Sequence, residues 1–296
     1  MKIQECLNRV FLKDTMELLK ELPSRCIDVV YGDPDYNVGI KYGDKSYTKT
    51  FDEYIRWYTE LVKESLRVLK DTGNMFLINY PKQNSYLRVK YLDDACYEVL
   101  DYTWVYNSNI GHSSKRFTTA HRSILHCRKT RDNNFYKNNV AVPYKNPTDR
   151  RILNNLANGS QGRMPYDWLY FDLVKNVSLE KTFHACQIPQ KLSETLICSC
   201  TKPNDIVLVL FGGSGSEIEV CKNTGRNFIS AELDKKYYDL IIDRLQKGKI
   251  DQNHRLRLRR NKLYSMKEPF LAATSHRQNP WQQAMTDDNT AVRKSA

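Results

Sequence analysis

Residues 205–234 read DIVLVLFGGSGSEIEVCKNTGRNFISAELD and carry the strongest structural signal in the chain. They hold an apolar run, a cluster of glycines, a segment with helical spacing and a second apolar run, in that order. These parts are typical of a strand, a tight loop, a helix and another strand. The order predicts a β-α-β unit that binds a nucleotide-like cofactor at the loop.

Three glycines in this stretch, Gly212, Gly213 and Gly215, let the backbone turn sharply and approach a ligand closely. The second strand ends at Glu232, 17 positions after Gly215, close to the spacing at which an acid binds the hydroxyl pair of a ribose. The spacing alone leaves a dinucleotide and S-adenosylmethionine open as ligands. Ile218 stands where the third glycine of a G-x-G-x-x-G pattern would fall, which weakens the dinucleotide alternative.

The same alternation of strands and helices runs through most of the chain. Apolar runs predict strands at 26–33, 74–81, 98–107 and 122–129, and helical spacing predicts helices at 16–23, 51–70, 189–202 and 235–248. This rhythm predicts a doubly wound, mostly parallel α/β sheet. We divide the chain into a first half of the domain at 1–130, an inserted segment at 131–181, a second half at 182–250 and a basic tail at 251–296.

The composition indicates a protein of the reducing cytoplasm. The eight cysteines include no C-x-x-C pair, so we expect neither a disulfide framework nor a metal site. No run of about 18 apolar residues is present and the first residues lack a signal core, so neither a membrane span nor secretion is expected. The net charge of +12 suits a polyanionic partner, although residues 247–296 carry +7 of it.

A second signal lies at residues 31–39, YGDPDYNVG, directly after a predicted strand. An ordinary turn explains two acids and a proline after a strand. It does not explain the aromatic ring of Tyr36, which a polar turn does not need.

Together, DPDY at 33–36 and FGGSG at 211–215 resemble the two motifs of the amino-group DNA methyltransferases, which use S-adenosylmethionine. In that family a (Asp/Asn/Ser)-Pro-Pro-(Tyr/Phe) motif follows one strand and a Phe-x-Gly-x-Gly loop follows another. The catalytic motif comes first here and the cofactor loop last, an order that resembles the β group. The resemblance covers roughly residues 6–246. It implies a Rossmann-like methyltransferase fold in which the insertion at 131–181 recognises the DNA target.

The resemblance also assigns cofactor-binding residues by position. An acid precedes the short helix before the catalytic strand, and HACQIPQKL at 184–192 matches the segment that holds the methionine part. The implied cofactor-binding residues are Asp14, Asp33, His184, Gln187, Phe211, Gly212, Gly213, Ser214, Gly215, Ser216 and Glu232. The sequence departs from the family at Val209, where an acid is common.

The implied chemistry gives each residue of the first motif a role. The exocyclic amine of adenine is a poor nucleophile because its lone pair is delocalised into the ring. Asp33 and the main-chain carbonyl of Pro34 would accept its two N–H groups, and the amine would attack the sulfonium methyl in line. The base must be flipped out of the duplex, and Tyr36 would stack on it, a contact worth about 1–3 kcal/mol.

Three further residues are expected to contact DNA. Lys115 and Arg116 lie in GHSSKRFTTAH at 111–121, which resembles a late region of the catalytic half, and are candidates for phosphate contacts. Asp35 stands where the family usually has proline and adds a charge near the base.

The resemblance implies transfer of a methyl group from S-adenosylmethionine to adenine N6 in double-stranded DNA, because an aspartate at position 33 favours adenine by family habit. Three alternatives stay open: N4-cytosine methylation by the same site, methylation of RNA, and a DNA-binding relative without activity. A cognate restriction endonuclease and a second copy in a homodimer are further partners that the resemblance suggests.

Overall fold

The computed structural model describes residues 1–39, 41–42, 45–46, 49–107, 114–175, 178 and 180–248, with the backbone alone for 41–42 and 45–46. The described residues belong to one unit, Met1–Leu256, and the second unit, Arg257–Ala296, lies outside them. The predicted basic tail at 251–296 therefore falls outside the described residues.

Among the described residues, an eight-stranded sheet has the strand order β1-β10-β9-β2-β5-β7-β6-β8. Its strands are β1 (Arg9–Leu12), β2 (Ile27–Gly32), β5 (Leu69–Asn79), β6 (Glu98–Val105), β7 (His121–Arg128), β8 (Trp168–Tyr170), β9 (Ile206–Val209) and β10 (Asn227–Glu232). Strand β7 is antiparallel to both of its neighbours, and the other pairs are parallel. A separate hairpin pairs β3 (Lys41–Tyr42) with β4 (Lys45–Ser46). The predicted doubly wound, mostly parallel α/β fold is confirmed.

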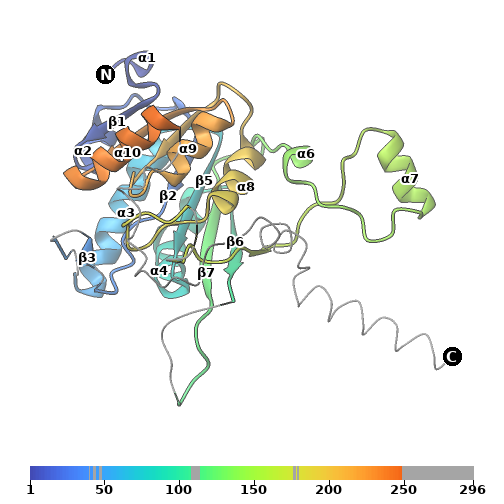
Figure 1. Ribbon diagram of the computed structural model, residues 1–296, viewed down its shortest axis with the longest axis horizontal. Helices are drawn as coiled ribbons and strands as arrows, with labels where there is room; N and C mark the ends of the chain where they lie inside the picture. Colours follow the sequence, from blue (N-terminus) through green and yellow to red (C-terminus); the bar gives the residue numbers. More distant parts are fainter. Residues whose placement is uncertain are drawn as a thin grey trace, which may run out of the picture. The chain divides into compact units, whose positions relative to one another are not determined.

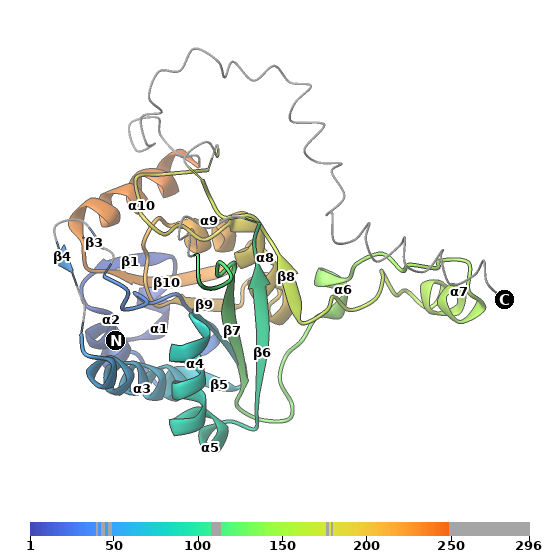
Figure 2. The same ribbon diagram turned by 90° about the horizontal axis from the view of Figure 1, so that it is seen from below.

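Helices cover both faces of this sheet (Figure 1 and Figure 2). One hydrophobic core includes side chains of α2 (Thr15–Glu21), α3 (Phe51–Val68) and α4 (Pro81–Leu87), and the other includes side chains of α8 (Gln190–Cys200), α9 (Ser216–Asn223) and α10 (Lys235–Lys247). Because side chains alternate along a strand, β2 supplies Val30 to the first core and Tyr31 to the second. Such a strand reads as a continuous apolar run, which is why the sequence predicted it.

The boundary between α3 and β5 differs from the prediction. The sequence predicted a helix at 51–70 and a strand at 74–81, whereas the helix ends at Val68 and β5 begins at Leu69. The register between β2 and β5 shifts between Ile27 and Val29, which accommodates the extra residues of β5. Gly73 is packed so closely there that a Cβ atom would lie 2.6 Å from Leu69 Cδ1.

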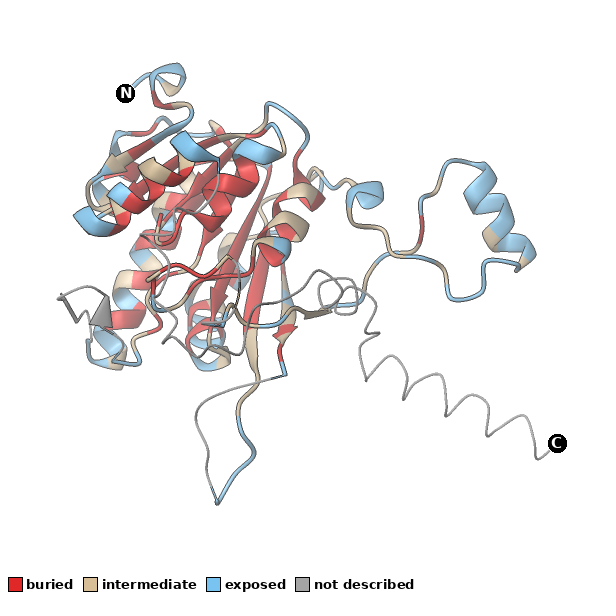
Figure 3. Cartoon of the chain, viewed as in Figure 1, coloured by how far each residue is buried: buried red, intermediate tan, exposed pale blue. Residues whose placement is uncertain are grey.

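Several short elements were not predicted. They are α1 (Ile3–Cys6), β1, α4, the following π-helix (Arg88–Leu92), α5 (Asp93–Ala95), α6 (Lys137–Val140), α7 (Arg150–Ala157) and β8. Strand β8 lies within the predicted insertion at 131–181 and joins the sheet beside β6. Helix α7 has no buried residue (Figure 3). The boundaries of the insertion and its role stay predictions.

No helix among the described residues is long and apolar enough to cross a membrane.

The topology brings the two motif loops together at the carboxyl ends of two neighbouring strands. Strands β2 and β9 are parallel neighbours with Tyr31 opposite Val209, so the loops that follow them leave the sheet side by side. The Leu210 amide donates a hydrogen bond to the Tyr31 carbonyl at 3.0 Å, which continues the pairing beyond the strand end. The DPDY and FGGSG segments therefore meet although about 180 residues separate them in the sequence.

Candidate active site

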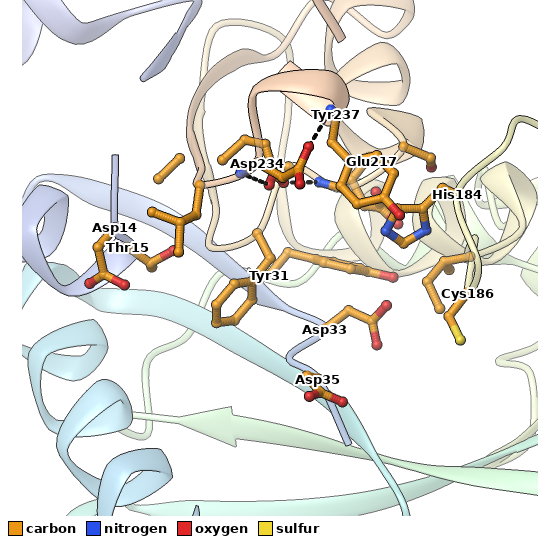
Figure 4. Close-up of a pocket in the computed structure, with 18 of the residues that line it drawn as sticks. Asp14, Thr15, Tyr31, Asp33, Asp35, His184, Cys186, Glu217, Asp234 and Tyr237 are labelled. Atoms are coloured by element: carbon orange, nitrogen blue, oxygen red, sulfur yellow. Dashed lines mark hydrogen bonds between the residues drawn. The ribbon is translucent and has the colours of Figure 1, made fainter. Parts of the chain in front are cut away.

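A cavity of about 210 Å³ opens where these loops meet (Figure 4). Nine of the residues singled out in the sequence line it: Asp14, Asp33, Asp35, His184, Phe211, Gly212, Gly213, Ser214 and Glu232. Five others do not line it: Pro34, Tyr36, Gln187, Gly215 and Ser216. The two basic DNA candidates, Lys115 and Arg116, are exposed on the loop between β6 and β7.

Asp33 follows β2 directly and holds the central carboxylate of the cavity. It keeps partial exposure because it lines the cavity, yet the surrounding protein keeps most water away. The pKa of Asp33 is raised to about 8, mainly by burial and also by the charge of Glu217, while a hydrogen bond from the Tyr36 hydroxyl and the charge of Arg122 oppose the rise. Asp33 therefore favours its protonated form at neutral pH until a positive charge arrives.

The backbone after Asp33 is held by side chains from two helices. The Tyr54 hydroxyl of α3 donates to the Asp35 carbonyl at 2.7 Å, and Gln83 Nε2 of α4 donates to the Tyr36 carbonyl at 2.8 Å. Among the residues that the structure describes, none donates a hydrogen bond to the carbonyl of Pro34. This leaves the Pro34 carbonyl able to accept a hydrogen bond from a substrate.

The ring of Tyr36 is buried rather than open to the cavity. Its side chain is 4% exposed and contacts Tyr80 edge-on at a centroid distance of 5.4 Å. The guanidinium of Arg122 lies 5.4 Å from the Tyr36 ring and 3.9 Å from the Tyr80 ring, and Arg122 also donates a hydrogen bond to Tyr106. Stacking of a base on Tyr36 stays a prediction.

The glycine loop has the backbone shape that its sequence suggested. Gly213 has φ +52°, and a Cβ atom there would lie 3.3 Å from His184 Nε2. Gly215, at φ +77°, is the N-cap of α9, a conformation that a residue with a side chain adopts only with strain. The loop thus turns sharply at the cavity and packs closely against His184.

Glu232 stands at the end of β10 beside this loop. Its two carboxylate oxygens accept hydrogen bonds from the main-chain amides of Gly213, at 2.7 Å, and Asp234, at 2.8 Å. Each oxygen can accept a second hydrogen bond, so the carboxylate can still bind a ribose hydroxyl pair. Burial raises the pKa of Glu232, while the two amides oppose the rise.

The segment after the insertion lines the cavity beside the glycine loop. His184 is buried, and burial lowers its pKa to about 4, so its imidazole is neutral. Gln187 lies outside the cavity because it is used within the segment. Its oxygen accepts the Thr182 amide at 3.0 Å, and its Nε2 donates to the Glu180 carbonyl at 2.7 Å. Gln187 therefore shapes the segment around His184 in this structure.

Two other positions have structural explanations. Asp14 caps α2 by accepting a hydrogen bond from the Met16 amide at 2.8 Å, and it also lines the cavity. Val209, where the family often has an acid, is 1% exposed and packs in a hydrophobic core. An acid at Val209 would need a partner that this core does not offer.

Sequence reasoning missed several residues that line the cavity. They are Thr15, Tyr31, Lys49, Tyr54, Trp57, Cys186, Ile188, Glu217, Ala231, Leu233, Asp234 and Tyr237. Glu217 is the most informative of them, because it is a carboxylate in a helix turn that directly follows the glycine loop. That position in the sequence could have identified it.

A buried ion pair between α9 and α10 supports the glycine loop. Arg244 of α10 donates to Glu219 of α9 at 2.6 Å and to the Ser214 carbonyl at 2.6 Å. Arg244 is 2% exposed, and Gln190 also donates to Glu219 at 2.5 Å. The loop is therefore fixed to α10 by one guanidinium.

The cavity suits an adenosine-containing cation. It offers a carboxylate for a ribose, the aromatic rings of Phe211 and Trp57, and carboxylates such as Asp33 and Glu217 for positive charge. Within the described part of the chain, no group of three or more His, Cys, Asp or Glu could hold a metal ion.

Comparison with known proteins agrees with this geometry. A family model described as "DNA methylase" matches residues 27–243. The type II methyltransferase M.BglII of Bacillus subtilis is 30% identical over 263 residues, which span 84% of this chain and 71% of the relative. The DNA adenine methyltransferase YhdJ of Escherichia coli (strain K12) is 27% identical over 241 residues, which span 78% of this chain and 80% of the relative.

Solved structures share the fold. The PvuII DNA methyltransferase (cytosine-N4-specific) aligns with a TM-score of 0.60 at 20% identity, covering 82% of this chain and 86% of that chain. The M1.HpyAVI-SAM complex aligns with a TM-score of 0.57 at 23% identity, covering 80% of this chain and 98% of that chain. The family model spans both motif loops of the cavity. The protein therefore belongs to the DNA methylase family, as an amino-methyltransferase of the restriction-modification type with S-adenosylmethionine as its cofactor.

Proposed function

We propose that the protein methylates adenine N6 in double-stranded DNA, on a base that is flipped out of the duplex into the cavity. The observation that carries the proposal is that two hydrogen-bond acceptors, the Asp33 carboxylate and the Pro34 carbonyl, belong to adjacent residues. The carbonyls of Asp35 and Tyr36 are occupied by Tyr54 and Gln83, whereas the Pro34 carbonyl accepts nothing from the described residues. Asp33 lines the cavity and Pro34 follows it directly in the chain, so the two residues offer two adjacent acceptors for the two N–H groups of an exocyclic amine.

The reaction needs Asp33 in its carboxylate form. The positive sulfonium of the cofactor favours the ionised form of a nearby acid, which offsets the burial that raises the pKa of Asp33 to about 8. The carboxylate and the Pro34 carbonyl then hold the amine so that its nitrogen lone pair faces the methyl carbon. A nitrogen–carbon bond forms as the carbon–sulfur bond breaks, and the bonding pair leaves with sulfur. The nitrogen loses a proton afterwards.

The choice of adenine rests on Asp33 as the first motif residue and on the family habit that accompanies it. The relatives include an adenine enzyme and the solved structures include a cytosine-N4 enzyme, so the base needs a direct test. The proposal also places the enzyme in the cytoplasm with its DNA. A partner endonuclease and a homodimer stay predictions, as do the phosphate contacts of Lys115 and Arg116.

The test is mass spectrometry of nucleosides from unmethylated duplex DNA incubated with the protein and S-adenosylmethionine. N6-methyladenine in the wild type and none with Asp33→Ala is the expected result. N4-methylcytosine would overturn the base assignment and keep the mechanism. Product from RNA alone would overturn the substrate, and no product from either would favour a binding protein without activity.

A further inference from the structure

The cavity is strongly acidic although the chain carries a net charge of +12. Lys49 is its single lining lysine or arginine among the described residues, and His184 is neutral because burial lowers its pKa to about 4. The lining carboxylates are Asp14, Asp33, Asp35, Glu217, Glu232 and Asp234. S-Adenosylmethionine brings two positive groups, the sulfonium and the α-ammonium, so more than one carboxylate has a charge to meet.

Glu217 is a lining carboxylate that neither sequence motif assigned to the cofactor. It lies in the first turn of α9, is 6% exposed and lines the cavity. Ser193 Oγ of α8 donates to Glu217 Oε1 at 3.3 Å, and Ser193 Oγ lies 3.1 Å from the Tyr31 hydroxyl of β2. Among the described residues, the Glu217 side chain thus has a neutral hydroxyl as its partner and no ion pair. A buried carboxylate in that state is costly unless a ligand supplies the charge.

The charged groups around Glu217 do not neutralise it. Arg244 exerts an attractive field but is bonded to Glu219 and the Ser214 carbonyl. Glu180 adds negative charge nearby, and Asp33 does so whenever it is ionised, while burial raises the pKa of Glu217 to about 7. The site thus combines an enclosed carboxylate with an excess of negative charge.

The position of Glu217 indicates which of the two positive groups of S-adenosylmethionine it can bind. Figure 4 places Glu217, His184 and Cys186 on one side of the cavity and Asp14 with Thr15 on the other, with Asp33 between the two groups. The reacting methyl must face Asp33, so the sulfonium lies beside Asp33. The amino-acid chain continues from the sulfur, and its ammonium has N–H donors that a sulfonium lacks.

We propose that Glu217 binds the α-ammonium group of the methionine part of S-adenosylmethionine, with Ser193 orienting the carboxylate. This assignment rests on the methyltransferase function but not on which base is methylated. It makes Glu217 a cofactor-binding residue that acts by a charge-assisted hydrogen bond. Arg244 and Glu219 hold the helix that presents it.

The test is titration calorimetry without DNA, using three ligands that differ in the relevant groups. S-Adenosylmethionine has both positive groups, S-adenosylhomocysteine keeps the ammonium but has no sulfonium, and 5′-methylthioadenosine has neither. Glu217→Gln should weaken binding of the first two by at least about tenfold and change the third by less than about twofold. Glu232→Gln is the matched control and should weaken all three, because it acts on the ribose.

Each other pattern would overturn the assignment. Loss of affinity for S-adenosylmethionine alone would place Glu217 at the sulfonium, and equal loss for all three ligands would mean a distorted loop. Unchanged affinities would remove Glu217 from the site. The melting temperature of each variant without ligand checks that it folds, and a failure to methylate adenine would leave these results intact.

A second measurement determines how many protons are released when the cofactor binds. Part of the Glu217 population is protonated at pH 6.5 in the free protein and should ionise when the ammonium binds, so binding should release protons. Calorimetry in two buffers of different ionisation enthalpy measures that release. A release equal in the wild type and in Glu217→Gln would contradict the proposed contact.

Discussion

The Tyr36 hydroxyl donates a hydrogen bond of 2.5 Å to Asp33 Oδ1, so the two outer residues of the DPDY motif are bonded to each other. This bond favours the ionised form of Asp33 and opposes the burial that raises its pKa to about 8. Tyr36 therefore tunes the carboxylate, in addition to the stacking role that its ring was predicted to have.

Removing only this hydroxyl should shift the pH dependence of methylation. Tyr36→Phe should raise the pKa of Asp33 further, so that the rise of activity with pH moves to higher pH. Because activity requires the carboxylate, we expect about a tenfold loss at pH 7 and partial recovery near pH 9, a shift of about one pKa unit. Single-turnover rates across pH measure this. Tyr80→Phe leaves the bond to Asp33 in place and should keep the wild-type profile, and an unshifted profile for Tyr36→Phe would argue against tuning.

In the protein without cofactor, Asp33 should lower the free energy of unfolding at alkaline pH. Its folded-state pKa of about 8 lies above the ordinary value, so the folded state binds more protons and the free energy of unfolding falls as pH rises from about 4 to 8. Asp33→Asn should therefore raise the melting temperature by about 2–4 °C at pH 8, and not at pH 4, while abolishing methylation. Calorimetry at the two pH values decides, and a variant that melts lower at pH 8 would contradict the expectation.

The Arg244–Glu219 pair should be essential for stability. Arg244→Met leaves Glu219 buried without its cation and frees the Ser214 carbonyl, which should cost about 3–5 kcal/mol in urea unfolding. Replacing both residues with methionine should recover part of that loss. The control is Lys235→Met on the same helix, which removes an exposed pair with Asp239 and should cost no more than about 0.5 kcal/mol. Equal costs for the two single variants would refute the argument.

Gly213 should be required for both backbone shape and cofactor space. Gly213→Ala places a Cβ atom 3.3 Å from His184 Nε2 at φ +52°, so affinity for S-adenosylmethionine should fall and stability should drop by about 1–2 kcal/mol. Gly159→Ala is a matched control, because Gly159 has φ +83° but a Cβ atom there meets nothing within 4 Å. It should lose similar stability and keep full affinity in binding titrations. If both variants bind normally, the loop tolerates a side chain.

Local patterns predicted the parts of the site that one segment can encode. The glycine loop, its helix and Glu232 lie within residues 205–234, and DPDY directly follows an apolar strand. The periodicity of apolar residues and the residues typical of turns were therefore enough to predict these parts. Short elements such as β1 and β8 were not predicted, because three or four residues carry too little periodicity. The antiparallel direction of β7 depends on pairing with β5 and β6, which is not encoded in its own residues.

Contacts between distant segments explain the residues that were missed. Glu217 directly follows the glycine loop in the sequence, but its burial depends on the packing of α9 against α8. Arg122 lies on β7, yet it contacts Tyr36 of the motif loop. Gln187 matched a cofactor position in the sequence, but the hydrogen bonds of its side chain lie within its own segment.

The pairing of β1 with β10 has a consequence for how such a chain can be rearranged. The first strand of the described fold lies beside the last one, and α10 packs on β1, so β1 and α10 are neighbours in space. A linker between them, with new ends opened in the exposed α7 region, would give a circular permutant that begins with the cofactor half. The order of the two motifs is thus a property of where the chain is cut, and not of the site that they build.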